Sequence, residues 1–182
     1  MPTETTSTMK TYIANFGTEN WAWKNCLDRS SIAVMDDLRV HPYWQRGDRE
    51  GYIVEAQRVL KSRRNLPVTK PAASRSFSVN SLLMETSGDL WIHREKEWLW
   101  WTESLDTIPE SEIVDDPQYL PERVKIIVYY KRCSPWSRQS RNGGKLPPWA
   151  GIHPKAREFL FTEGTLQQLS PDNALYAQAR QL

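Results

Sequence analysis

Four of the nine tryptophans in this chain lie within eleven residues, in a stretch that also has the pattern of a β-hairpin. Two predicted strands, residues 90–93 and 98–104, are joined by a charged turn. Because side chains alternate along a strand, Trp98 and Trp100 are expected on one face and the residues that follow each of them on the other. A core rarely needs so many indoles in one place, since every buried indole N–H requires a partner. We therefore expect one face to be core and part of this cluster to be available for stacking.

The length and composition predict a single globular domain. A chain of 182 residues can bury a substantial core, and 39% hydrophobic with 25% charged residues is typical of a globular protein. Residues 1–9 are polar and lack apolar periodicity. We expect a disordered leader there, followed by one domain over residues 10–182 that includes the C-terminal helices.

The remaining patterns predict an α+β fold. Besides the hairpin, strand patterns occur at residues 11–16, 31–35 and 124–130. Helices are expected from Asp48, a capping residue, to about Arg64, and then at residues 78–85, 154–161 and about 170–180. Pro67 and Pro71 bracket a predicted connector before the second helix.

Two further rings, Trp21 and Trp23, follow Asn20 in the connection between the first two strands. If this connection is extended, the two rings lie on the same side of the chain, so that one can be core while the other is exposed. They can either close the end of the core or contribute to a surface for stacking.

The charges are unevenly distributed, although the net charge is only +2. Residues 103–122 hold seven acids and no Lys or Arg, whereas residues 123–157 hold nine bases and no acid. A basic block of this kind can bind a polyanion, because each base that neutralises a phosphate releases counterions. The alternative is a solvated loop paired with the neighbouring acidic segment.

Several classes of protein are excluded by what the sequence lacks. There is no apolar signal stretch, no hydrophobic run long enough to span a membrane and no cysteine spacing typical of metal sites, so we expect a cytoplasmic protein without a metal or cofactor. The motifs GxSxG, GxxxxGK[ST] and GxGxxG are also absent, so no catalytic residues are assigned.

The order of segments resembles the PUA-like superfamily, and within it the EVE and YTH type of modified-base readers, which includes DNA-binding modules of modification-dependent restriction systems. The likeness spans about residues 10–170. The matching features are Tyr12–Phe16 followed by Trp21 and Trp23, the strand entry Gly88–His93, and the strand Val124–Tyr130. The resemblance implies a small, partly closed β-barrel with flanking helices that accepts a flipped, modified base of DNA or RNA.

The resemblance and the aromatic pattern together predict a base pocket and a phosphate-binding loop. The expected pocket residues are Asn20, Trp21, Trp23, Trp91, His93, Trp98, Trp100 and Trp101. The expected phosphate-binding residues are Lys131, Arg132, Arg138, Arg141 and Lys145. Base–aromatic stacking contributes about 1–3 kcal/mol per base, so two rings can roughly offset the cost of base extrusion.

Two other functions are compatible with the sequence. The chain could be a small metal-independent ribonuclease or toxin-like hydrolase that uses His93 and Glu103 in acid–base catalysis. It could also be a tryptophan-rich protein-interaction module of a defence system, with a partner nuclease or another defence protein bound at the rings.

Overall fold

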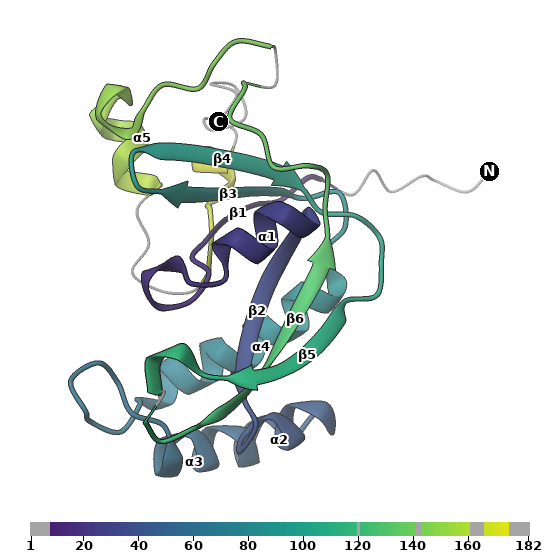
Figure 1. The fold of residues 1–182 in the computed structure, drawn as a ribbon, viewed down its shortest axis with the longest axis vertical. Helices are drawn as coiled ribbons and strands as arrows, with labels where there is room; N and C mark the ends of the chain where they lie inside the picture. Colours follow the sequence, from purple (N-terminus) through teal and green to yellow (C-terminus); the bar gives the residue numbers. More distant parts are fainter. Residues whose placement is uncertain (1–7, 120, 141–142, 161–165, 175–182) are drawn as a thin grey trace. The chain divides into compact units, whose positions relative to one another are not determined.

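The computed structural model describes residues 8–119, 121–140, 143–160 and 166–174, and these residues divide into two compact units (Figure 1). Unit 1 is drawn from residues 1–15, 87–106 and 133–182. Unit 2 is drawn from residues 16–86 and 107–132. The chain therefore enters and leaves unit 2 twice.

Unit 1 is built on a four-stranded sheet with the order β4-β3-β1-β7. Its strands are β1 (Thr11–Ala14), β3 (Leu90–Glu95), β4 (Trp98–Glu103) and β7 (Leu166–Gln168). Strands β1 and β3 are parallel, while β3 pairs with β4, and β1 with β7, in the antiparallel sense. The short helices η3 (Trp149–Gly151) and α5 (Pro154–Phe159) precede β7 in the chain.

One face of this sheet forms the core of unit 1. Ile13, Ile92 and Leu99 are almost fully buried there with Leu146 and Ile152 from the C-terminal segment. Trp101 packs against the same cluster, whereas Trp98 keeps 38% of its surface exposed. The alternation predicted for the tryptophan-rich strand is therefore confirmed, because Leu99 and Trp101 face the core and Trp98 does not.

Unit 2 holds a three-stranded antiparallel sheet with the order β2-β6-β5 and most of the helices. The strands are β2 (Ser31–Asp37), β5 (Glu110–Asp115) and β6 (Lys125–Arg132). The helical segments are η1 (Thr18–Asn20), α1 (Trp23–Arg29), α2 (His41–Gln45), α3 (Arg49–Val59), α4 (Lys70–Glu85) and η2 (Pro117–Tyr119).

Helices contact both faces of this second sheet. On one face, the amide of Asn25 in α1 donates to the Tyr130 hydroxyl of β6. On the opposite face, the Lys131 ammonium of β6 donates to the carbonyl of Met84 in α4. Helix α3 packs on α2 and α4, and its Tyr52 is fully buried in the helical core.

The helix starting at Asp48 is confirmed, but it ends earlier than predicted. The Asp48 carboxylate accepts a hydrogen bond from the Gly51 amide, and α3 ends at Val59 instead of Arg64. The next helix was predicted too short, because α4 already begins at Lys70. Thr69 caps it, and Pro71 is compatible with the first helical turn, where its missing N–H has no partner to lose.

The expectation of an extended segment through Trp21 and Trp23 is wrong. Trp23 is the first residue of α1, and η1 precedes it, so the two rings are not related by strand alternation. The Trp21 ring instead lies against Gly17, whose φ is +83°, and an added Cβ there would overlap the indole nitrogen. Gly17, which directly precedes η1, therefore makes room for this ring.

We expect Gly17→Ala to lower the free energy of unfolding by about 2–3 kcal/mol, since it adds overlap with Trp21 to the strain of a backbone conformation, φ +83° and ψ 176°, that is adopted almost only by glycine. Gly47→Ala is the matched control, because Gly47 has a φ of +73° but no atom within 4 Å of an added Cβ. It should cost only about 1 kcal/mol. Equal losses of stability in urea titrations of the two variants would show that the Trp21 ring can move away from the added methyl group at little cost.

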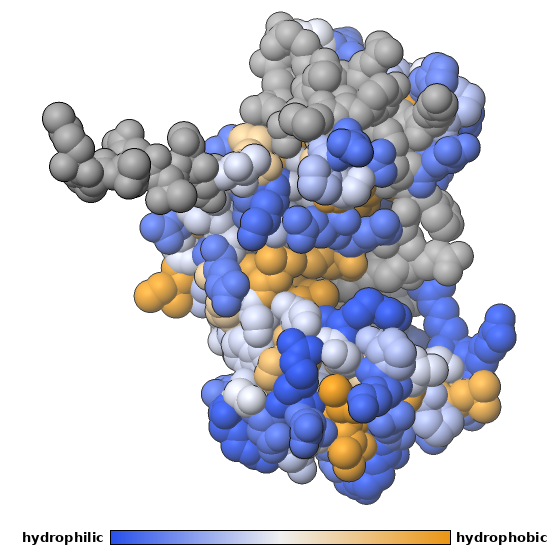
Figure 2. All heavy atoms as spheres, turned by 180° about the vertical axis from the view of Figure 1, so that it is seen from behind, coloured by the Kyte–Doolittle hydropathy of each residue, from blue (hydrophilic) through white to orange (hydrophobic). Residues whose placement is uncertain are grey.

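The α+β class is confirmed, and the strands of the described segments form two open sheets, not one closed barrel. Within those segments, no helix combines the length and the apolar character needed to cross a membrane. In the view of Figure 2, apolar residues form several separate patches between hydrophilic ones. Most of the predicted leader and of the last predicted helix lies outside the described residues.

Candidate functional site

The face of the β3–β4 hairpin opposite Leu99 and Trp101 carries several predicted pocket residues. Trp100 pairs with His93 across the strands, and Trp98 pairs with Glu95. Cross-strand partners point to the same face, so His93, Trp98 and Trp100 lie together on it. Trp91, two residues before His93 on β3, points to the same face, so the structure brings together four of the predicted pocket residues within unit 1.

Arg138 completes this arrangement. The backbones of Trp101 and Ser137 exchange two hydrogen bonds of 2.9 and 3.0 Å, which hold the loop after β6 against β4. The Arg138 guanidinium then lies 3.6 Å from the centre of the Trp98 ring and 5.7 Å from that of Trp100. Both distances are within the range of cation–π attraction. We call Trp98, Trp100 and Arg138 the tryptophan–arginine cluster.

The cluster is accessible in part. Trp98 is 38% exposed, and Trp100 and Arg138 are half-buried. An indole face next to a guanidinium can hold a planar base by stacking while the cation attracts the adjoining phosphate. This chemistry requires that the Arg138 side chain move aside or stack on the other face of the base.

Trp91 and His93 are buried in the described structure. The Trp91 ring lies 4.9 Å from that of Tyr12, and the Trp136 ring packs edge-on at 6.3 Å from His93. His93 Nδ1 is 2.9 Å from the Ala14 carbonyl oxygen, so in the neutral ring Nδ1–H donates to it. Burial lowers the pKa of His93 to about 4, and the bond to Ala14 only partly opposes this. The alternative function, a hydrolase, would use this buried histidine in acid–base catalysis.

The other predicted pocket residues belong to unit 2 or to the core. Asn20 and Trp21 are half-buried in unit 2, and the Asn20 side-chain oxygen accepts from the Phe16 amide. Trp23 is buried and stacks on Phe16 at 6.0 Å. Trp101 faces the core of unit 1 and donates its indole N–H to the Gln139 carbonyl.

The predicted phosphate-binding residues are also divided between the two units. Arg138 and the exposed Lys145 belong to unit 1, and Arg141 lies outside the described residues. Arg132, in unit 2, is exposed and lies 3.5 Å from Glu110. Lys131 differs from the expectation of a surface base, because it is 1% exposed and donates to the Met84 carbonyl. Strand alternation turns it into unit 2, where it holds the end of α4.

Two ring contacts of unit 1 were missed by the sequence analysis. Trp136 lies inside the predicted basic loop and packs on His93, a role that its position among bases did not indicate. Arg94 was interpreted as a residue of the solvated turn, but its guanidinium lies 4.1 Å from the centre of the Trp149 ring.

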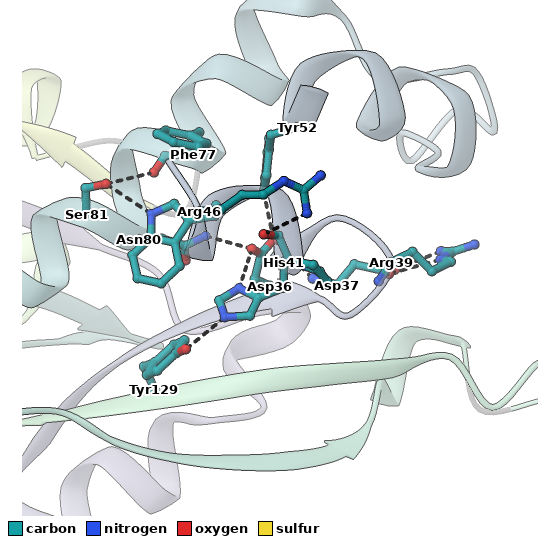
Figure 3. A network of polar contacts seen from close by, with 12 residues as sticks. Asp36, Asp37, Arg39, His41, Arg46, Tyr52, Phe77, Asn80, Ser81 and Tyr129 are labelled. Carbon is teal, nitrogen blue, oxygen red and sulfur yellow. Dashed lines mark hydrogen bonds and ion pairs between the residues drawn. The ribbon is translucent and has the colours of Figure 1, made fainter. Parts of the chain in front are cut away.

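A second group of polar residues, in unit 2, was not predicted at all (Figure 3). The Asp36 carboxylate accepts from the Tyr52 hydroxyl at 2.7 Å and from the Asn80 amide at 2.8 Å. It also lies 2.9 Å from His41 Nδ1, and His41 Nε2 lies 2.8 Å from the Tyr129 hydroxyl. We call these five residues the Asp36 network.

Metal and thiol chemistry find no support among the residues that the structure describes. No group of three or more potential His, Cys, Asp or Glu ligands is assembled there. Cys26 and Cys133 are buried thiols, and burial raises the pKa of Cys133 to about 12. Comparison of the chain with protein-family models, curated proteins and solved structures finds no match. Its function therefore has to be inferred from its own side chains.

Proposed function

We propose that the protein binds nucleic acid and holds an unpaired, modified base against the tryptophan–arginine cluster. The observation that supports this most directly is the Arg138 guanidinium 3.6 Å above a Trp98 ring that is 38% exposed. A planar cation over a partly exposed indole marks a position where a flat, electron-rich ring can stack once the Arg138 side chain moves. Lys145 is exposed in the same loop as Arg138 and can contact the phosphate backbone of the nucleic acid.

We also propose that the protein is related to the PUA-like modified-base readers. The order of its segments and the placement of its tryptophans support this relation. A reader of this type takes the base out of its stack, which costs a few kcal/mol. Stacking of the base on Trp98 and Trp100 would supply about 1–3 kcal/mol per base. The partner would be DNA or RNA that carries a modified base, and no catalytic step is needed.

We expect Trp98→Ala to weaken the binding of a single-stranded 12-nucleotide oligomer about tenfold, because it removes the most exposed stacking ring. Binding is measured by fluorescence anisotropy of labelled DNA and RNA oligomers that carry one unmodified, methylated or hydroxymethylated base. Arg138→Ala should weaken all of the oligomers and reduce the salt dependence of binding, since one phosphate contact is lost.

Trp149→Ala is the matched control. Trp149 is also half-buried beside a guanidinium, but it packs against the core cluster on the opposite face of the sheet. Circular dichroism establishes that each variant is folded. The proposal is wrong if Trp98→Ala binds as tightly as the wild type, or if Trp149→Ala loses as much affinity as Trp98→Ala.

A further inference from the structure

The Asp36 network contains a chain of three groups in which an acceptor, a base and a hydroxyl follow one another. Asp36 Oδ2 lies 2.9 Å from His41 Nδ1, and His41 Nε2 lies 2.8 Å from the Tyr129 hydroxyl. A hydroxyl within hydrogen-bond reach of a base that a third group orients is the general arrangement of an activated nucleophile. Figure 3 shows this chain running from Asp36 through the imidazole to the phenol on β6.

The direction of each hydrogen bond follows from Asp36. A carboxylate can only accept, so the proton of a neutral His41 ring lies on Nδ1. The Nε2 lone pair then faces Tyr129, and the phenol donates to it. The imidazole is fixed by stacking on Trp44 at 5.1 Å, and the Trp44 indole donates in turn to Ser81. His41 is therefore held in the tautomer and orientation of a base for the phenol.

Tyr129 is the end of the network that reaches the surface. Asp36, His41, Tyr52 and Asn80 are all buried, whereas Tyr129 is half-buried. On the neighbouring strand β5, its partner in register is the exposed Ser111. Ile113, the next β5 residue on that face, is 59% exposed. Exposed side chains therefore adjoin Tyr129 on the β5 side, and we infer that a small molecule approaches the phenol from there.

We propose that Tyr129 is a nucleophile that accepts acyl groups from uncharged esters, with His41 as its base and Asp36 as the residue that positions His41. The Tyr129 oxygen attacks the ester carbonyl carbon while its proton passes to His41 Nε2. The tetrahedral adduct then expels the alcohol oxygen, which takes that proton, and the products are an O-acyl tyrosine and the alcohol. Water repeats the two proton transfers to release the carboxylic acid.

The surroundings of Tyr129 favour an uncharged substrate. Lys131, two residues along the same face of β6, is turned inward to the Met84 carbonyl. Lys125, on that face at the start of β6, is already paired with Asp115 at 2.6 Å. Burial and the charge of Asp36 raise the pKa of Tyr129, so the phenol is protonated at neutral pH and depends on His41 for its activation. Neither Lys131 nor Lys125 is therefore available to bind the negative charge of a phosphate ester.

The test is the reaction of the whole protein with p-nitrophenyl acetate. At neutral pH we expect a burst of p-nitrophenol and an added acetyl group that peptide mass spectrometry locates on Tyr129. Tyr129→Phe should abolish the burst. Tyr43→Phe is the matched control, because Tyr43 is also half-buried in unit 2 but lies outside the network, and it should keep the wild-type burst. Acetylation spread over lysines, or a burst that survives in Tyr129→Phe, would overturn the proposal.

Two more variants separate the base from the positioning residue. His41→Gln keeps a polar side chain but no base, so the burst rate should fall about 100-fold. In Asp36→Asn the amide can donate to Nδ1, which moves the imidazole proton to Nε2 and removes the base without emptying the site. The same amide also turns a donor toward the Asn80 amide, so this variant should lose some stability, and its burst rate should fall when it is expressed per folded protein measured by circular dichroism. A rate equal to that of the wild type in either variant contradicts the assigned role.

Discussion

Replacement of Asp36 by alanine is expected to lower the free energy of unfolding by about 4 kcal/mol. The carboxylate accepts hydrogen bonds from His41, Tyr52 and Asn80, and each of these donors is at most 2% exposed. Without Asp36 these donors remain inside the protein with no acceptor, and each buried donor that loses its partner costs about 1–3 kcal/mol. Partial rearrangement and entry of water keep the total below the sum of three such losses.

Urea unfolding followed by tryptophan fluorescence gives the free energy of each variant. The matched control is Asp28→Ala, since Asp28 is paired with Lys24 on the surface of α1, where both side chains are more than half exposed. Exposed pairs of this kind contribute less than about 1 kcal/mol. A loss for Asp36→Ala no larger than that for Asp28→Ala would mean that the network closes around the missing carboxylate.

The local elements of this fold could be predicted because their signals lie within a few residues of one another. The alternation of Trp98, Leu99 and Trp101 predicted the two faces of β4 without knowledge of what packs on them. Asp48 predicted the start of α3 from a single side chain, and the structure shows its hydrogen bond to the Gly51 amide. In both cases the determining interaction is local in the sequence.

The errors come from positions where two local signals compete. Pro71 was interpreted as the end of a connector, but Thr69 caps a helix in which the proline occupies the first turn. Trp23 was placed in an extended segment, although the residues after it continue as α1. In both cases the composition was compatible with two structures, and the packing of the helix decided between them.

The Asp36 network shows what a single sequence does not reveal. His41 and Tyr129 are 88 residues apart, and Asn80 is 44 residues from Asp36. Nothing in the spacing of these residues joins them, because the sheet order β2-β6-β5 and the crossing of α4 bring them together. The tryptophan–arginine cluster could be predicted in part, because Trp98 and Trp100 lie two residues apart on one strand.

The wild-type protein should lose about 3 kcal/mol more stability than His93→Gln when the pH is lowered from 7 to 4. The folded state holds the pKa of His93 at about 4, against about 6.5 for an exposed histidine, and burial is the main cause. Below pH 6.5 the unfolded chain therefore binds a proton that the folded chain does not, so acid favours unfolding. One pKa unit corresponds to about 1.4 kcal/mol.

Urea titrations at several pH values measure this difference, and it should develop between pH 6.5 and pH 4. Glutamine can still donate to the Ala14 carbonyl, so the substitution removes the titrating group but leaves a donor at the site. His153→Gln, at an exposed position, is the control and should follow the wild type. The Glu95 carboxylate lies 3.8 Å from His93 Nε2, beyond hydrogen-bond distance, and does not compensate for burial. If the wild type and His93→Gln respond alike to acid, His93 has access to water, and the face that it shares with Trp98 and Trp100 is open at its centre as well as at its edge.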